Sequence, residues 1–164
     1  MTTAEIAKPL TRLFSELVDG IKERKGGYVL NTGDIGLLAS LDRLSAAEAS
    51  DSSNGGATIA AHAQHLRYGL SLMNRWIAEG GNPFADAKWD EAWMISEVDQ
   101  AAWREIQMGL RDETQRWHQH LGTPREVDQV AATGLISSIA HFAYHMGAIR
   151  QISKTARGPR EGTF

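Results

Sequence analysis

Hydrophobic residues recur at helical spacing in several long stretches of the chain. The first stretch advances by four, three, four and four residues, through Ile6, Leu10, Leu13, Leu17 and Ile21. These steps keep side chains on one face of a helix. Thr2 and Glu5 have capping-box spacing before this stretch, and Gly26-Gly27 follows it. The pattern predicts a helix between these signals, with Pro9 causing either a kink or a later start.

Two further helices are predicted from end signals and apolar faces. One begins near Thr58 and stops at 80–83, where the sequence Gly-Gly-Asn-Pro disfavours helix. One face of this helix carries His62, His65, Gly69, Leu72 and Trp76. The next begins with Asp99 as its N-cap and ends at 122–124. Its apolar face consists of Trp103, Ile106, Leu110, Trp117 and Leu121.

The last helix is predicted over about 126–154 and carries two neighbouring stripes. One stripe reads Val127, Ala131, Gly134, Ser138, His141, His145, Ala148 and Ile152. The other reads Leu135, Ile139, Phe142, Met146 and Ile149. Two stripes make a wide apolar face, which a single subunit of a bundle has little reason to carry. The pattern therefore predicts a homodimer.

The connection at 28–57 is the least regular part of the chain. It has a short leucine-rich stretch near 37–44, a second capping-box spacing at 45–48 and a loop-like Asp-Ser-Ser-Asn-Gly-Gly segment. Because this connection is long, the first two long helices need not form an antiparallel hairpin. With no strand-like alternation, we expect an all-α four-helix bundle with a long crossover connection. We expect one domain over 1–155 and a flexible tail over 156–164.

Composition narrows the location and the partners. The net charge of −3 gives no basic surface for nucleic acid or for an anionic membrane. The chain has no cysteine and starts without a signal-peptide pattern, so we expect a cytoplasmic protein. The run from Gln129 to Ile149 has no charged residue and is long enough to span a bilayer. Its serines, its tyrosine and its two histidines favour a helix buried in protein instead.

His141 and His145 lie one helical turn apart, so their imidazoles are neighbours and can share one metal ion. His65, with the small Gly69 one turn later, offers a third nitrogen. Three imidazoles with open positions are the ligand set of catalytic zinc sites. The alternative is a hydrogen-bonded pair of core histidines. His118 and His120 point to different faces and are expected at a solvated helix end.

Three segments resemble the DinB-like, or YfiT-like, superfamily of metal-dependent enzymes. They are TIAAHAQHLRYGL, KWDEAWMISEVDQAAWREI and SIAHFAYHMGAIRQI. The shared pattern is a histidine before leucine in the second helix, then H-x-x-x-H followed by a small residue and Gln in the last helix. The resemblance covers nearly the whole chain and is weakest in the first helix.

The resemblance implies that His65, His141 and His145 hold a divalent ion such as zinc or nickel, with His62 as a rival ligand or a neighbour of the site. It also implies a dimeric four-helix bundle with a crossover. The implied activity is low-molecular-weight thiol S-transfer or hydrolysis of a small-molecule substrate. The alternative is a non-catalytic dimeric module that binds metal or ligand in a stress response. The sequence leaves open the metal, the substrate, the acid or base residue and whether the protein is catalytic.

Overall fold

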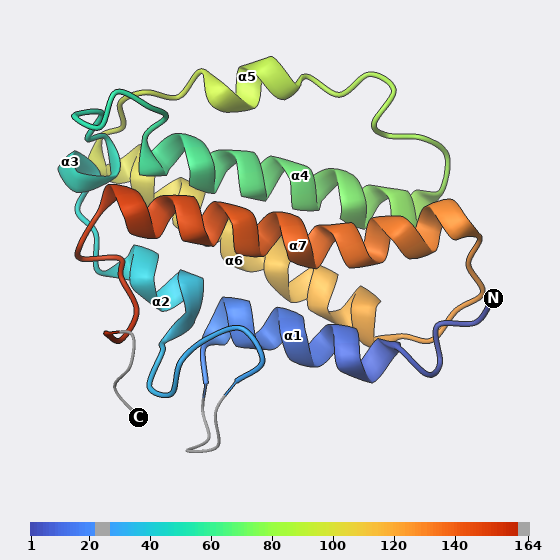
Figure 1. The fold of residues 1–164 in the computed structure, drawn as a ribbon. Helices are drawn as coiled ribbons and strands as arrows, with labels where there is room; N and C mark the ends of the chain where they lie inside the picture. The colour runs from blue at the N-terminus through green and yellow to red at the C-terminus, as the bar shows by residue number, and fades with distance from the viewer. Residues whose placement is uncertain (22–26, 161–164) are drawn as a thin grey trace.

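The computed structural model describes residues 1–21 and 27–160, whose secondary structure is helical apart from one isolated bridge between Thr2 and Glu126 (Figure 1). The four longest helices are α1 (Ala7–Asp19), α4 (Ile59–Glu79), α6 (Gln100–Gly122) and α7 (Gln129–Ile152). Three shorter ones are α2 (Gly36–Asp42), α3 (Ala46–Ala49) and α5 (Trp89–Trp93). The all-α prediction is therefore confirmed for the described residues.

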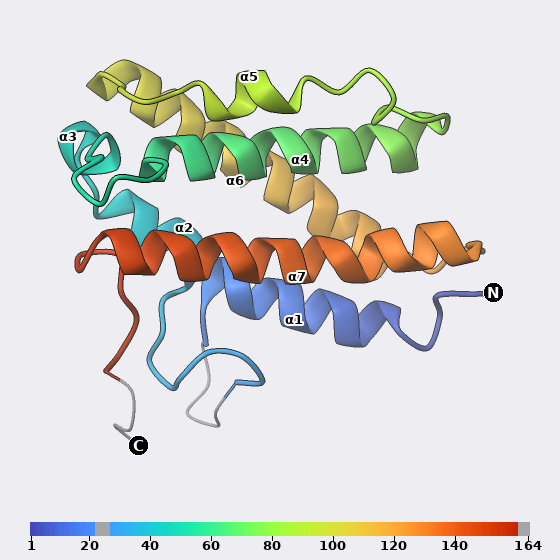
Figure 2. The same cartoon turned by 45° about the horizontal axis from the view of Figure 1, so that its top comes forward.

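The long helices pack pairwise, with both α1 and α4 against α6 and α7. Figures 1 and 2 show α1 and α7 running in one direction and α4 and α6 in the other. Because α4 and α6 are parallel, the segment 80–99 returns along the length of α4 and carries α5 on its outer side. The crossover is therefore this segment. Helices α1 and α4 run in opposite directions but pack against α6 and α7, not against each other as a hairpin, which agrees with the expectation from the long 28–57 connection.

Local capping fixes most helix starts where the sequence predicts them. The side chains of Thr58, Asp99 and Asp128 each accept a hydrogen bond from a backbone N–H three residues later. Ser45 and Glu48 form the predicted capping box of α3. These contacts satisfy amides that otherwise have no partner in the first turn of a helix. The predicted leucine-rich helix is α2, whereas α5 was not predicted.

Helix α1 differs from its prediction at both ends. It begins at Ala7, so Pro9 lies in the first turn, where its missing N–H costs no helical hydrogen bond. The capping box from Thr2 to Glu5 does not form, because Thr2 Oγ1 instead accepts from the amide of Ala4. The helix ends before Gly20, whose φ of 78° suits glycine. The predicted stop at Gly26-Gly27 lies partly outside the described residues.

The core is built around large side chains that are fully buried. Phe14 of α1 meets Phe142 of α7 edge to face at 5.2 Å between ring centroids. The indole N–H groups of Trp103 and Trp117 donate to Leu44 O and to Ser138 Oγ, both at 2.9 Å. Buried indoles keep a hydrogen-bond partner in this way. All five residues of the second α7 stripe are buried in this core.

Two buried acidic residues fasten the connection between α1 and α2. The Glu16 carboxylate accepts the backbone N–H groups of Tyr28, Val29 and Leu30 at 2.6–2.9 Å. Asp34 pairs with Arg150 of α7 at 2.7 Å. Both carboxylates thereby have partners that offset the cost of leaving water.

None of the helices in the described ranges is long and apolar enough to cross a bilayer, α7 included. At the end of the chain, Ala156 is fully buried, and Arg157 Nε donates to Arg150 O. Residues 161–164 lie outside the described part, so the flexible tail over 156–164 stays a prediction.

Candidate metal centre

Two antiparallel helices, α4 and α7, bring four histidines together. His62 and His65 come from the first two turns of α4, and His141 and His145 come from the second half of α7. His65 and His145 are buried, and His141 is the most exposed of the predicted triad. The i, i+3 and i, i+4 spacings place each pair on the helix face that meets the other helix.

The imidazole nitrogens of His65, His141 and His145 converge. His141 Nε2 lies 3.1 Å from His65 Nε2 and 3.0 Å from His145 Nε2. One ligand atom from each of the three residues lies within 4.8 Å of the others. Two nitrogens bound to one tetrahedral zinc at 2.0–2.1 Å stand about 3.3 Å apart. The observed spacing is therefore that of a site for one ion, and the three predicted residues are brought together.

Hydrogen bonding alone does not satisfy this arrangement. A neutral imidazole has one N–H donor and one lone pair. His141 Nε2 has two imidazole nitrogens within hydrogen-bond distance. This nitrogen either accepts one N–H or donates one, so only one of its two contacts can be a hydrogen bond. A cation at the centre of the three nitrogens would accept all three lone pairs, so the residues present fit a metal ion.

His62 lies on the side of the His145 ring that faces away from His141. Its Nδ1 is 2.9 Å from His145 Nδ1, whereas His145 Nε2 faces the triad. A ligating histidine usually donates its second N–H to a neighbouring acceptor, which fixes the tautomer and the ring orientation. With an ion on His145 Nε2, the proton of His145 would sit on Nδ1 and point at His62 Nδ1, which would be the acceptor. His62 lies outside the group of converging ligand atoms found in the described residues.

Burial keeps the imidazoles neutral. Desolvation, followed by the neighbouring imidazoles, lowers the pKa of His145 to about 3 and that of His65 to about 4. Burial also lowers the pKa of His62 and that of His141. At neutral pH the nitrogens therefore carry free lone pairs, which is the form that binds metal.

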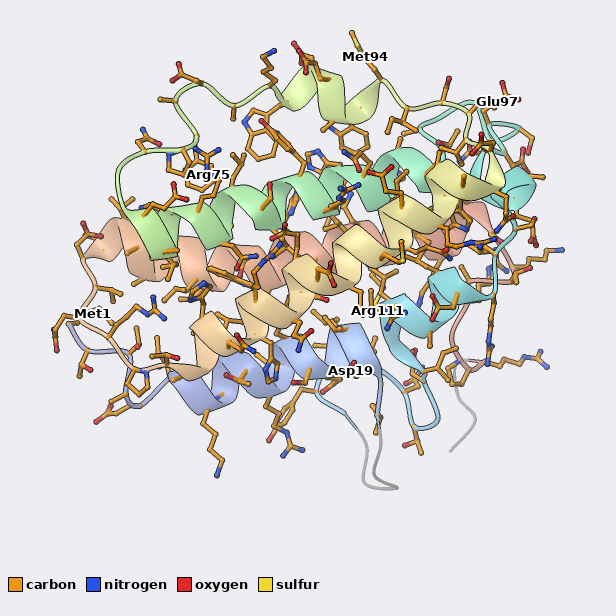
Figure 3. The ribbon with its side chains drawn as sticks, turned by 180° about the vertical axis from the view of Figure 1, so that it is seen from behind. Met1, Asp19, Arg75, Met94, Glu97 and Arg111 are labelled. Atoms are coloured by element: carbon orange, nitrogen blue, oxygen red, sulfur yellow. The ribbon has the colours of Figure 1, made fainter. Side chains whose placement is uncertain are left out.

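Aromatic rings of the crossover segment cover the site. Trp93 stacks on His65 with 4.3 Å between ring centroids, and its ring lies 5.2 Å from His62 and 5.6 Å from His145. Trp89 approaches His65 at 5.5 Å. Figure 3 shows ring side chains filling the space between the α5 segment and α4, while Met94 points away from the other helices. The sequence does not distinguish Trp89 and Trp93 from the core residues Trp103 and Trp117, because both pairs follow helical spacing.

The remaining candidate residues lie elsewhere. His118 is half-buried rather than solvated, and its Nε2 lies 2.7 Å from Ser15 Oγ of α1. His120 is also half-buried, beside Trp117. Glu113, which lies near the apolar face of α6, pairs with Asn74 and with Arg116. None of these three joins the histidine group, so the centre found in the described residues contains imidazoles alone.

Comparison of the chain with protein-family models, with curated proteins and with solved structures gave no significant match. The comparisons therefore name no family, metal or substrate. The described residues form an all-helical fold with three histidines close enough to hold one metal ion.

Proposed function

We propose that this chain is a metal-binding four-helix bundle of the DinB-like, or YfiT-like, type, and that His65, His141 and His145 hold one divalent ion, most naturally zinc or nickel. The observation that carries the proposal is the convergence of the three Nε2 atoms around His141. The lowered pKa values, the contact between His62 Nδ1 and His145 Nδ1 and the crossover that makes α4 and α6 run in the same direction also support it.

We propose further that the ion serves an enzyme, one that transfers a low-molecular-weight thiol or hydrolyses a small substrate in the cytoplasm. A divalent ion on three neutral imidazoles keeps its charge and lowers the pKa of water or of a thiol, which supplies a nucleophile at neutral pH. The chain has no cysteine, so the sulfur would come from a cosubstrate. His62 orients His145, and Trp93 limits the access of water to His65.

A second function, a non-catalytic metal- or ligand-binding module, is favoured by one observation. Among the described residues, no carboxylate joins the three histidines, so the centre lacks an acidic group that could act as a general base. A screen of metal-loaded protein against several thiols and electrophiles separates the two functions. Turnover that depends on the ion and on His141 supports the enzyme, and tight metal binding without turnover of any tested pair supports the module.

A homodimer is part of the proposal. Its support is the outward face of α7, which is exposed and carries no charge from Val130 through Ile136 and Ala140 to Tyr144. The exposed fractions are 74% for Val130, 56% for Ile136 and 71% for Tyr144. An uncharged, exposed helix face that carries three large apolar side chains supports an interaction surface, although polar residues lie between them.

Metal analysis tests the central claim. Purified protein, stripped with a chelator and reloaded, should bind one zinc or nickel ion per chain in titration calorimetry. His65→Ala and His141→Ala should each weaken binding at least tenfold, whereas the matched control His118→Ala, outside the group, should bind as the parent does. Equal metal affinity in all four proteins would place the ion elsewhere and refute the assignment.

A further inference from the structure

A pocket opens beside the metal centre, between α4 and α7 and under the segment that carries Phe84 and Trp89. Its volume is about 340 Å³. Small-molecule sites start at about this size, and a cavity of roughly 150 Å³ is enough for benzene. The pocket therefore has room for a ring or for a short branched chain.

The pocket begins at the metal-binding edge of His141. Both His141 and Trp89 line it. A Cβ atom added to Gly69 would lie 3.8 Å from His141 Cε1 and 3.8 Å from Trp89 Cζ3. Cε1 is bonded to Nε2, the nitrogen that faces His65 and His145. A group held at the nitrogens can thus extend past Gly69 into the pocket without crossing the protein.

The lining of the pocket is almost entirely apolar. It contains no Asp, Glu, Lys or Arg, and its polar side chains are Ser137, Ser138 and His141. Ser138 already donates to Leu135 O at 2.7 Å and accepts from Trp117 Nε1 at 2.9 Å. A charged group seated against this lining would lose part of its hydration without gaining an ionic partner, which is costly.

We propose that this pocket binds the apolar part of the ligand that the metal centre serves, so the ligand is a small molecule with a metal-binding head, such as a thiolate, and an uncharged hydrocarbon or aromatic tail. The proposal rests on the proposed metal site for the head group. It selects against cosubstrates whose charge lies within a few bonds of the sulfur, because that charge would enter the apolar space.

A spectroscopic binding series tests the proposal without relying on turnover. Full-length protein is loaded with cobalt(II), and thiolate binding is followed by the sulfur-to-cobalt charge-transfer band. The probes are n-alkyl thiols from ethanethiol to pentanethiol, with 3-mercaptopropionate and cysteine as charged probes. Affinity should rise about threefold to fourfold for each methylene that enters the pocket. The charged probes should bind at least tenfold more weakly than the alkyl thiol of similar length.

Gly69→Leu supplies the structural control, because its side chain would fill the space between His141 and Trp89. This variant should keep its cobalt affinity within about threefold of the parent and bind all alkyl thiols as weakly as ethanethiol. The matched variant Gly147→Leu, where an added Cβ atom meets nothing within 4 Å, should keep the full dependence on chain length.

The outcomes separate the two proposals. Cobalt binding without any dependence on chain length, or with the same dependence in Gly69→Leu, overturns the pocket and leaves the metal site intact. Failure of cobalt to bind overturns the metal function, and the pocket is then tested with toluene by amide chemical shifts. Shifts around Gly69 that vanish in Gly69→Leu uphold the apolar pocket, and the absence of such shifts in the parent overturns it.

Discussion

Acid should destabilise the metal-free protein steeply because the histidine cluster is buried in its neutral form. The pKa of His65 is lowered to about 4 and that of His145 to about 3, whereas both imidazoles titrate near 6.5 in the unfolded chain. Between pH 6.5 and about 4, the unfolded chain therefore binds two protons that the folded protein does not. The free energy of unfolding then falls as the pH falls, and it levels off only below the folded pKa values.

The size of the effect follows from linkage. Each histidine contributes up to about 1.4 kcal/mol per pH unit below the unfolded pKa, which amounts to about 2 kcal/mol between pH 7 and pH 5. The two together remove about 4 kcal/mol, a large share of the 5–15 kcal/mol that stabilises a typical domain. Urea unfolding in the presence of a chelator, at several pH values from 7 to 5, measures this loss.

His145→Gln isolates the contribution of one imidazole. The variant should lose about 2 kcal/mol less than the parent over the same pH range, even if it is less stable at pH 7. Carboxylates titrate equally in both proteins and cancel in the difference. His118→Gln, outside the cluster, should keep the steep loss of the parent. Identical pH dependence in the parent and in His145→Gln would show that the cluster is not buried in neutral form, and the reasoning would fail.

Three further predictions concern the metal, a loop and the surface. A hundredfold excess of zinc over its dissociation constant should stabilise the parent by about 2.7 kcal/mol in thermal unfolding. His141→Ala should abolish this gain, and a gain of equal size in the variant would exclude the triad. Because burial lowers the ligand pKa values, the gain should persist below pH 6.5 and fade towards pH 4. Glu16→Ala should lower the free energy of unfolding by about 3 kcal/mol in urea, since three backbone N–H groups lose a charged acceptor, whereas exposed Glu5→Ala should change it by less than about 0.5 kcal/mol. Tyr144→Glu should turn a dimer into a monomer in light scattering, with exposed Met94→Glu as the control, and a monomeric parent would refute the dimer.

Local signals in the sequence predict the starts of α4 and α6, and tertiary contacts explain the elements that were missed. Thr58 and Asp99 cap their own first turns, so the neighbouring residues suffice to predict them. Helix α5 has five residues, too few to form a stable helix alone. Its Trp89 and Trp93 rings pack against His65 of α4. Nothing within its own segment predicts that contact.

The candidate site divides in the same way. The spacing of His141 and His145 within one helix indicates neighbouring imidazoles, because a turn of α-helix is regular. That His65 reaches them depends on how α4 and α7 are aligned, which the sequence of neither helix specifies. The part played by His62 depends on ring orientation, since His62 and His65 both face α7. Only the contact between His62 Nδ1 and His145 Nδ1 distinguishes an orienting neighbour from a ligand.

The packing of α7 decides which of its faces is available to a partner. The two hydrophobic stripes of this helix predict that one of them meets a partner. In the structure, the stripe through Phe142 fills the core, and the stripe through His141 faces α4. Neither stripe is therefore free for a partner.

The third face of α7, through Ile136, Ala140 and Tyr144, is mixed in composition. Its uncharged surface borders the apolar pocket at Ser137. A partner docked on this face would lie beside the pocket entrance, so Tyr144→Glu should alter the binding of long alkyl thiols as well as the oligomeric state. A monomeric variant that binds them as the parent does would show that the two surfaces are independent.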